Sequence, residues 1–213
     1  MDIIDKLAEI FKEFPGIGER QARRFVYFLM SRNGDYAGNL TKLISELKKE
    51  TAQCGECFRF FNLGHQPDNV ILAGGVGKKL CEICADKNID SSVLMVVEKD
   101  SDLESVKKSR IYSGKYFILG GLVPIVEKNT KSRVRIEELK EKIKNSKELK
   151  EIILAFSISP QGNHTDHYIR SELKAITEPL EIKISSLGRG LSTGTELEYS
   201  DNDTLKNALK NRQ

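Results

Sequence analysis

The four cysteines of the chain form two Cys-x-x-Cys pairs, and their spacing indicates more specific chemistry than any other residues in the sequence. Cys54 and Cys57 make the first pair, and Cys81 and Cys84 make the second. Each pair can supply two thiolates from one short turn, and folding can bring two such turns together as a tetrahedral ligand set. The sequence therefore predicts one structural Zn²⁺ per chain, bound by all four cysteines.

Two disulfides and a thioredoxin-type redox pair are the alternatives for the same pattern. Disulfides need an oxidising compartment. The first residues, from Met1 to Lys6, are charged rather than apolar, and no apolar run approaches the length that spans a membrane. We therefore expect a cytoplasmic, reducing location without membrane association. A redox pair needs one Cys-x-x-Cys motif rather than two, and His65, between the pairs, is expected on the surface rather than as a ligand.

The chain opens with a helix-hairpin-helix pattern. Apolar residues at helical spacing predict a helix over 4–14, Pro15 ends it, and the glycines after Pro15 allow a tight hairpin before a second helix over 19–30. Amides at the hairpin and at the start of the second helix can bind a DNA phosphate, and nearby arginines add positive charge. The pattern predicts DNA binding without sequence specificity through Gly16, Gly18, Arg20, Arg23 and Arg24. An ordinary helical turn with a solvated basic face is the alternative.

Composition alone does not identify a partner. The 213 residues are 31% charged and 39% hydrophobic, as in a soluble globular protein, and the net charge is +3. Because this charge is small, any surface that binds nucleic acid must be a local one. A third helix is expected to complete a helical unit before Cys54, with one face formed by Leu40, Leu43, Ile44 and Leu47.

Strands and helices alternate after Cys84. The apolar runs predict strands over 92–98, 116–119, 151–156 and 181–187, separated by helices over 100–110, 136–147 and 164–177. Such alternation predicts a mixed α/β fold with a mostly parallel sheet. Glu98 ends the first of these strands, at the edge where ligands and partners usually meet a parallel sheet.

The order of these three signals resembles the RecR family of bacterial recombination mediator proteins, whose α/β unit is a Toprim domain. The local matches are Phe14-Pro15-Gly16-Ile17-Gly18, Val96-Val97-Glu98 with Asp102, Leu119-Gly120-Gly121 and the run from Gly188 to Tyr199. The resemblance covers essentially the whole chain. It implies a helix-hairpin-helix DNA-binding unit over 1–53, a four-cysteine zinc motif over 54–90, a Toprim α/β domain over 91–187, and a glycine-rich loop with a C-terminal arm over 188–213.

The resemblance also implies a function. Members of the RecR family are not enzymes; they form homodimers or ring-like homotetramers and work with RecO, and with RecF, in recombinational DNA repair. They help to load the strand-exchange recombinase onto single-stranded DNA. By this resemblance, Arg20 and Arg24 contact DNA, Glu98 and Asp102 lie near a partner-binding surface, no residue is catalytic, and zinc holds the fold.

The sequence departs from the family pattern in two places. The run between the cysteine pairs is longer than usual, so an extra hairpin or excursion is expected within 58–80. The acidic Glu-Gly-Glu of the family reads Gln161-Gly162-Asn163 here. Toprim enzymes use acids from this loop to bind magnesium, because a hard divalent ion needs anionic oxygens. A magnesium-dependent Toprim nuclease or primase-like enzyme, using Glu98, Asp100 and Asp102, is therefore the alternative rather than the expected function.

Two other groups of residues could suggest chemistry. The run from Gly74 to Lys79 is similar to a phosphate-binding loop, but no Ser or Thr follows its lysine, so nucleotide binding is not expected there. His164 and His167 flank Asp166, and the three are expected to be ordinary polar residues on an exposed helix start.

Overall fold

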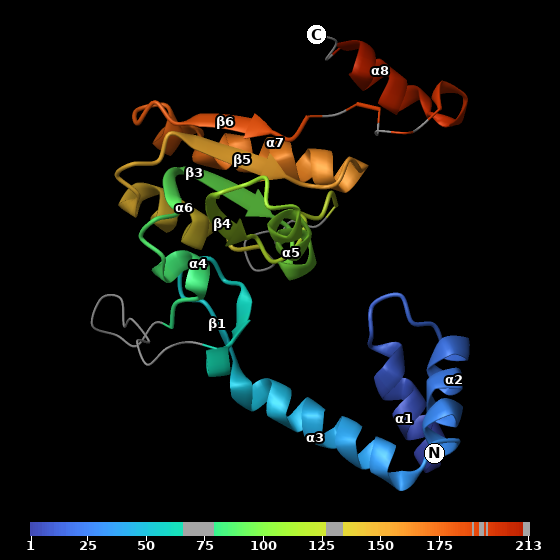
Figure 1. Ribbon diagram of the computed structural model, residues 1–213. Helices are drawn as coiled ribbons and strands as arrows, with labels where there is room; N and C mark the ends of the chain where they lie inside the picture. The colour runs from blue at the N-terminus through green and yellow to red at the C-terminus, as the bar shows by residue number, and fades with distance from the viewer. Residues whose placement is uncertain (66–78, 127–133, 189, 192–193, 195, 211–213) are drawn as a thin grey trace. The chain divides into compact units, whose positions relative to one another are not determined.

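A computed structural model describes residues 1–65, 79–126, 134–188, 190–191, 194 and 196–210 (Figure 1). The chain divides into two compact units. The first contains Met1–Ala52 and Asn62–Gly64, and the second contains Gln53–Phe61 and His65–Gln213. Within the described residues, no helix combines the length and the apolar character needed to cross a membrane.

Three helices form the first unit: α1 (Ile3–Lys12), α2 (Glu19–Met30) and α3 (Gly34–Glu50). Asp2 caps α1 by accepting a hydrogen bond from the amide of Asp5, and Asn33 caps α3 in the same way with the amide of Tyr36. The helices predicted from periodicity are thus present.

The core of the first unit is small. It contains Ala8 from α1 together with Ala22 and Val26 from α2, and partly buried residues pack around these three: Ile4, Leu7, Phe11 and Ile17. Helix α3 buries no residue fully. Much of the apolar surface of this unit is therefore exposed to solvent.

The cysteine-containing part of the chain has little regular structure. Strands β1 (Thr51–Gln53) and β2 (Phe60–Asn62) pair, the 3-10 helix η1 (Leu63–His65) follows, and the short helix α4 (Glu82–Ala85) begins directly after Cys81. The excursion predicted within 58–80 falls mainly on 66–78, which lie outside the described residues.

A four-stranded parallel sheet organises the rest of the second unit. Its strands are β3 (Asp90–Val97), β4 (Gly114–Ile118), β5 (Glu151–Ala155) and β6 (Lys183–Ser186), in the spatial order β4-β3-β5-β6 (Figure 1). In the register, Val96 pairs with Phe117 on one side and with Leu154 on the other. All carboxyl ends therefore lie at one edge of the sheet.

Three helices accompany this sheet: α5 (Asp100–Ser109), α6 (Ile136–Asn145) and α7 (Pro160–Thr177). The main core joins alternate residues of β3, β4 and β5 to the apolar faces of α6 and α7, and its fully buried members include Val96, Phe117, Leu154, Leu139, Ile143, Ile169 and Leu173. Helix α5 contributes the buried Leu103. These observations confirm the predicted mixed α/β fold with a parallel sheet.

Helix α7 begins at Pro160, four residues before the start at His164 that the sequence predicts. Ser159 accepts a hydrogen bond from the amide of Gly162, and proline is well suited to the first helical position because it lacks an amide proton. The periodicity of apolar residues did not reveal this polar first turn. Beyond the sheet, η3 (Leu197–Tyr199) and α8 (Asn202–Lys210) form the C-terminal segment.

Candidate metal centre and DNA-binding hairpin

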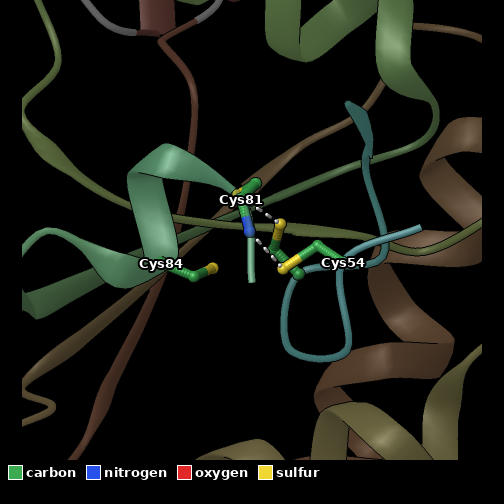
Figure 2. A group of neighbouring side chains, drawn as sticks. Cys54, Cys81 and Cys84 are labelled. Carbon is green, nitrogen blue, oxygen red and sulfur yellow. Dashed lines mark hydrogen bonds between the residues drawn. The ribbon is translucent and has the colours of Figure 1, made fainter. Parts of the chain in front are cut away.

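The four cysteines converge, as their spacing predicted. Their sulfur atoms all lie within 4.8 Å of one another, and the Sγ atoms of Cys57 and Cys81 are 3.6 Å apart. A tetrahedral site with zinc–sulfur bonds of about 2.3 Å places its sulfurs roughly 3.8 Å from one another. None of the four is in a disulfide, and Figure 2 shows the side chains of Cys54 and Cys84 pointing toward the space between the two turns. The donor set therefore fits a tetrahedral thiolate-bound metal ion.

Each cysteine pair lies on a tight turn that backbone hydrogen bonds hold. The amide of Phe58 donates to Cys54 O, and Phe58 itself takes the left-handed conformation with φ of 63°. In the second turn, the amide of Ala85 donates to Cys81 O, which starts α4. The Cys81 amide also donates to the Cys54 Sγ at 3.4 Å. The first two bonds close the individual turns, and the last one joins the two turns to each other.

The thiols also influence one another electrostatically. Hydrogen bonds from Cys57, then from Cys81 and Cys84, lower the pKa of the Cys54 thiol. A thiolate is the form that binds a metal ion. Hydrogen bonds within the same cluster, first of all from Cys54, raise the pKa of the Cys57 and Cys84 thiols, so the four thiols are not equally ready to lose their protons.

A buried arginine borders the metal centre, and sequence reasoning missed it. The side chain of Arg59 is 7% exposed; it donates from one terminal nitrogen to Glu82 at 2.6 Å and from the other to Glu104 at 2.7 Å. Burial opposes ionisation of Glu82, but hydrogen bonds from Lys107, from a backbone amide and from Arg59 outweigh it and lower the pKa of this carboxyl to about 2. Glu82 belongs to α4 and Glu104 to α5, so Arg59 joins the second cysteine turn to the α/β domain.

The first cysteine turn packs directly on the sheet. The amide of Ile118 donates to Cys57 O at 2.9 Å, and the ring of Phe58 lies edge-on to Phe117 with centroids 5.4 Å apart. The guanidinium of Arg135 lies 5.2 Å from the Phe58 ring centroid and donates to Ile118 O. The candidate metal centre thus packs directly against the sheet of the α/β domain.

The hairpin between α1 and α2 has an open backbone. Gly16 has φ of +78°, which favours glycine, and Gly18 takes the N-cap position of α2 with no side chain accepting from the first turn. A Cβ atom added at either glycine would meet nothing within 4 Å. A phosphate oxygen can therefore approach the amides at the start of α2, where the helix dipole favours an anion.

The three arginines predicted to bind DNA are not equivalent. Arg20 and Arg24 are exposed, and neither forms an ion pair with any acid in the described part of the chain. Arg23 is only partly exposed and contacts Asp5 at 3.1 Å and Glu19 at 3.7 Å. The charge of Arg23 is therefore compensated inside the unit. Arg24 donates to the neutral side chain of Gln21 at 3.1 Å, so the charges of Arg20 and Arg24 remain uncompensated among the described residues.

The acidic residues beside β3 have structural partners. Asp100 accepts a hydrogen bond from the amide of Phe60 at 2.8 Å, and Asp102 accepts from the amide of Lys99 at 3.3 Å, which caps α5. Glu98 is partly exposed, and its backbone carbonyl accepts from the amide of Gly120. The amides of Phe60 and Lys99 thus each occupy one carboxylate oxygen, of Asp100 and of Asp102 respectively. A magnesium-dependent enzyme would need these two acids to bind its metal ion.

Comparison with known proteins covers the whole chain. A Toprim domain model matches residues 92–186, and a RecR C-terminal model matches 190–213. The Recombination protein RecR of Legionella pneumophila subsp. pneumophila strain Philadelphia 1 is 31% identical over 212 residues, which cover 100% of this chain and 96% of that protein. The chain belongs to the RecR family. A RecR of Staphylococcus aureus strain Newman is 33% identical, with coverage of 98% of this chain and 96% of its own length.

Gln161, Gly162 and Asn163 lie in the first turn of α7, where the sequence predicts a loop, and Gly162 is required there for a steric reason. A Cβ atom at Gly162 would lie 2.0 Å from the Ser157 backbone oxygen, so only glycine fits. The neighbouring Asn163 has a buried Oδ1 without a hydrogen-bond partner among the described residues. Gln161 and Asn163, on either side of Gly162, are neutral amides and offer no anionic oxygen for magnesium.

The sequence also drew attention to a run similar to a phosphate-binding loop and to His164, Asp166 and His167, and the prediction for Asp166 is wrong. Residues 74–78 of the loop similar to a phosphate-binding loop lie outside the described residues. His167 is exposed and His164 is partly exposed, but Asp166 is buried, contrary to the prediction. Arg170 donates to Asp166 at 2.6 Å, and Ser186 also donates to it. Asp166 therefore ties α7 to β6.

Proposed function

We propose that this RecR family protein is a non-enzymatic recombination mediator that binds DNA without reading its sequence. The observation that carries the proposal is the open hairpin at Gly16 and Gly18, followed by the unpaired Arg20 and Arg24, in a chain whose full-length relatives are named recombination proteins. Backbone amides and arginines of this kind contact phosphates, and phosphate contacts carry no sequence information.

Zinc is the metal that we assign to the four cysteines. Four thiolates at tetrahedral spacing match a closed structural zinc site, which leaves no position open for substrate. Zinc bound there would hold the two turns together and keep the first turn packed on β4.

A homodimer or homotetramer is the proposed form of the protein. Leu43, Ile44 and Leu47 of α3 are each more than half exposed, at 54%, 59% and 62%. A contiguous apolar helix face of this kind usually marks a contact with another protein surface. A second copy of the chain is the partner that we assign to the α3 face.

RecO, and with it RecF, is proposed to bind near Glu98 and Asp102 at the carboxyl edge of the sheet. This assignment comes from the family resemblance and from the positions of Glu98, directly after β3, and of Asp102, in the first turn of α5. The amides at Gln161 and Asn163, together with the hydrogen bonds that engage Asp100 and Asp102, support a role without magnesium chemistry.

Substitution of both free arginines tests the DNA-binding proposal. We expect Arg20→Ala/Arg24→Ala to weaken binding of a labelled oligonucleotide roughly 10- to 100-fold at moderate salt. The slope of log affinity against log salt concentration should become shallower by about 1.4 for a single strand, because two phosphate contacts are lost. Fluorescence anisotropy over a series of salt concentrations measures both quantities.

The matched control removes two positive charges from another exposed part of the same unit. Lys48→Ala/Lys49→Ala in the last turn of α3 should change affinity by less than about threefold and leave the salt slope close to that of the wild type. Equal slopes for the wild type and the arginine double variant would contradict DNA binding through the hairpin.

A further inference from the structure

The exposed face of α2 carries aromatic rings as well as arginines. At 100° per residue, Arg20, Arg24, Tyr27 and Phe28 fall within an arc of about 100°. The buried Ala22 and Val26 lie on the opposite side of the helix. Tyr27 is 54% exposed and Phe28 is 41% exposed, so both rings are accessible from solvent.

The surface continues into α3, which follows α2 in the same unit (Figure 1). The guanidinium carbon of Arg32 lies 4.4 Å from the Phe28 ring centroid and 5.8 Å from that of Tyr36. Phe28 and Tyr36 pack edge to face, with centroids 5.9 Å apart, and Tyr36 is 43% exposed. We call this surface the aromatic stripe; its members are Arg20, Arg24, Tyr27, Phe28, Arg32 and Tyr36.

The charge of the aromatic stripe is almost entirely positive. Among the described residues, no acid forms an ion pair with Arg20, Arg24 or Arg32. The acids Asp5 and Glu19 pair with Arg23 on the flank of α2. Asp35 is the acid nearest in sequence to Tyr36, and it lies in the first turn of α3, where the helix dipole stabilises a negative charge.

We propose that the aromatic stripe binds single-stranded DNA, with Tyr27, Phe28 and Tyr36 stacking on unpaired bases while Arg20 and Arg24 follow the phosphates. This inference rests on the DNA binding proposed above and adds the substrate class, single strands, to it. Proteins that bind single strands combine a positively charged surface with aromatic rings, because every unpaired base offers a face for stacking. A duplex hides these faces in its own base stack and can use only the arginines.

A second copy of the chain fits the aromatic stripe less well. A two-fold contact would place the same patch on both subunits, and the unpaired arginines of one copy would then face those of the other. Like charges placed opposite each other disfavour such a contact. The apolar face of α3 around Leu43, Ile44 and Leu47 is better suited to self-association, because its exposed residues are aliphatic.

Substitutions that remove the rings but keep the apolar volume test the inference. The full-length triple variant Tyr27→Leu/Phe28→Leu/Tyr36→Leu should bind a fluorescein-labelled 30-mer of deoxythymidine at least about 100-fold more weakly than the wild type, since stacking contributes roughly fivefold or more per base and three rings are removed. Affinity for a 30-base-pair duplex should stay within about threefold. The control Tyr27→Phe/Tyr36→Phe keeps every ring and should bind the single strand as the wild type does.

A photocrosslink gives an independent readout. An oligonucleotide carrying 5-iododeoxyuridine should crosslink to Tyr27 or Tyr36 of the wild-type protein, and mass spectrometry of the digested product identifies the residue. A crosslink to neither tyrosine, together with unchanged single-strand affinity of the leucine variant, would overturn the inference.

The remaining outcomes separate this inference from the proposed function. If the leucine variant binds single strands normally while Arg20→Ala/Arg24→Ala loses binding, DNA binding by the hairpin stands and the stacking role is wrong. If the leucine variant instead changes the solution mass and leaves DNA affinity intact, the aromatic stripe is a subunit interface. If the wild type binds no DNA at all, both proposals are wrong.

Discussion

Loss of the metal should destabilise the second unit strongly. We expect Cys57→Ser, or treatment with a strong chelator, to lower the free energy of unfolding by about 4 kcal/mol or more, since structural zinc contributes ~10 kcal/mol in isolated finger peptides and less where a larger core persists. In a chain of this length, such a loss corresponds to a fall of roughly 10 °C in the melting temperature. Circular dichroism with metal analysis of the purified protein measures both effects.

The loss of stability is expected to be large because the first cysteine turn packs against β4 and the main core. Cys57 accepts from the amide of Ile118 in β4, and Phe58 packs on Phe117 in the main core. A turn that opens after metal loss therefore exposes part of the core as well as the thiols. His65→Ala should retain one zinc per chain, because four cysteines already complete the site. Purified protein without zinc, combined with an unchanged melting temperature for Cys57→Ser, would contradict the assignment.

Removal of the ion pairs of Arg59 should have the second large effect on the free energy of unfolding. The double variant Glu82→Gln/Glu104→Gln leaves the Arg59 guanidinium, which is 7% exposed, without a carboxylate partner. Removing the partners of a buried charge typically costs ~3–5 kcal/mol, and the partial exposure of both glutamates reduces this to about 2–4 kcal/mol. Urea denaturation of the metal-loaded protein measures the loss.

Two matched variants identify the cause. Replacing all three charges, in Arg59→Met/Glu82→Gln/Glu104→Gln, should recover much of the lost stability, because no buried charge then lacks a partner. Lys107→Gln removes only the more exposed contact to Glu82, and the expected cost is under about 1 kcal/mol. A triple variant less stable than the double variant would show that Arg59 acts through packing rather than through charge.

Local sequence patterns predicted the fold and the convergence of the four cysteines well. Two Cys-x-x-Cys pairs have few structural solutions, so Cys54, Cys57, Cys81 and Cys84 could be assigned from spacing alone. The apolar runs around Val96 and Leu154 are typical of buried parallel strands, and both lie in the core of the sheet. The predicted start of α7 was wrong because the first turn of this helix is polar, and only the Ser159-Pro160 pair indicates where the helix begins.

Contacts between residues distant in the sequence could not be predicted in the same way. Arg59 is 45 positions from Glu104, and no periodicity connects them. The compensation of Arg23 by Asp5 depends on how α1 packs against α2. The burial of Asp166 depends on Arg170 and on Ser186 of β6, so the local sequence around His164 gave no indication of it. By contrast, the exposed rings Tyr27 and Phe28 could have been found on a helical wheel, because they share the face of Arg20 and Arg24.

Recombinase assembly on coated single-stranded DNA tests the central claim most directly. The reaction contains labelled single-stranded DNA covered by its binding protein, the strand-exchange recombinase, RecO and magnesium, with or without this protein. We predict that the wild-type protein accelerates recombinase assembly, that Arg20→Ala/Arg24→Ala does not, and that the DNA is recovered at full length. Unchanged assembly together with magnesium-dependent shortening of the DNA, lost in Glu98→Gln, would contradict a non-enzymatic mediator.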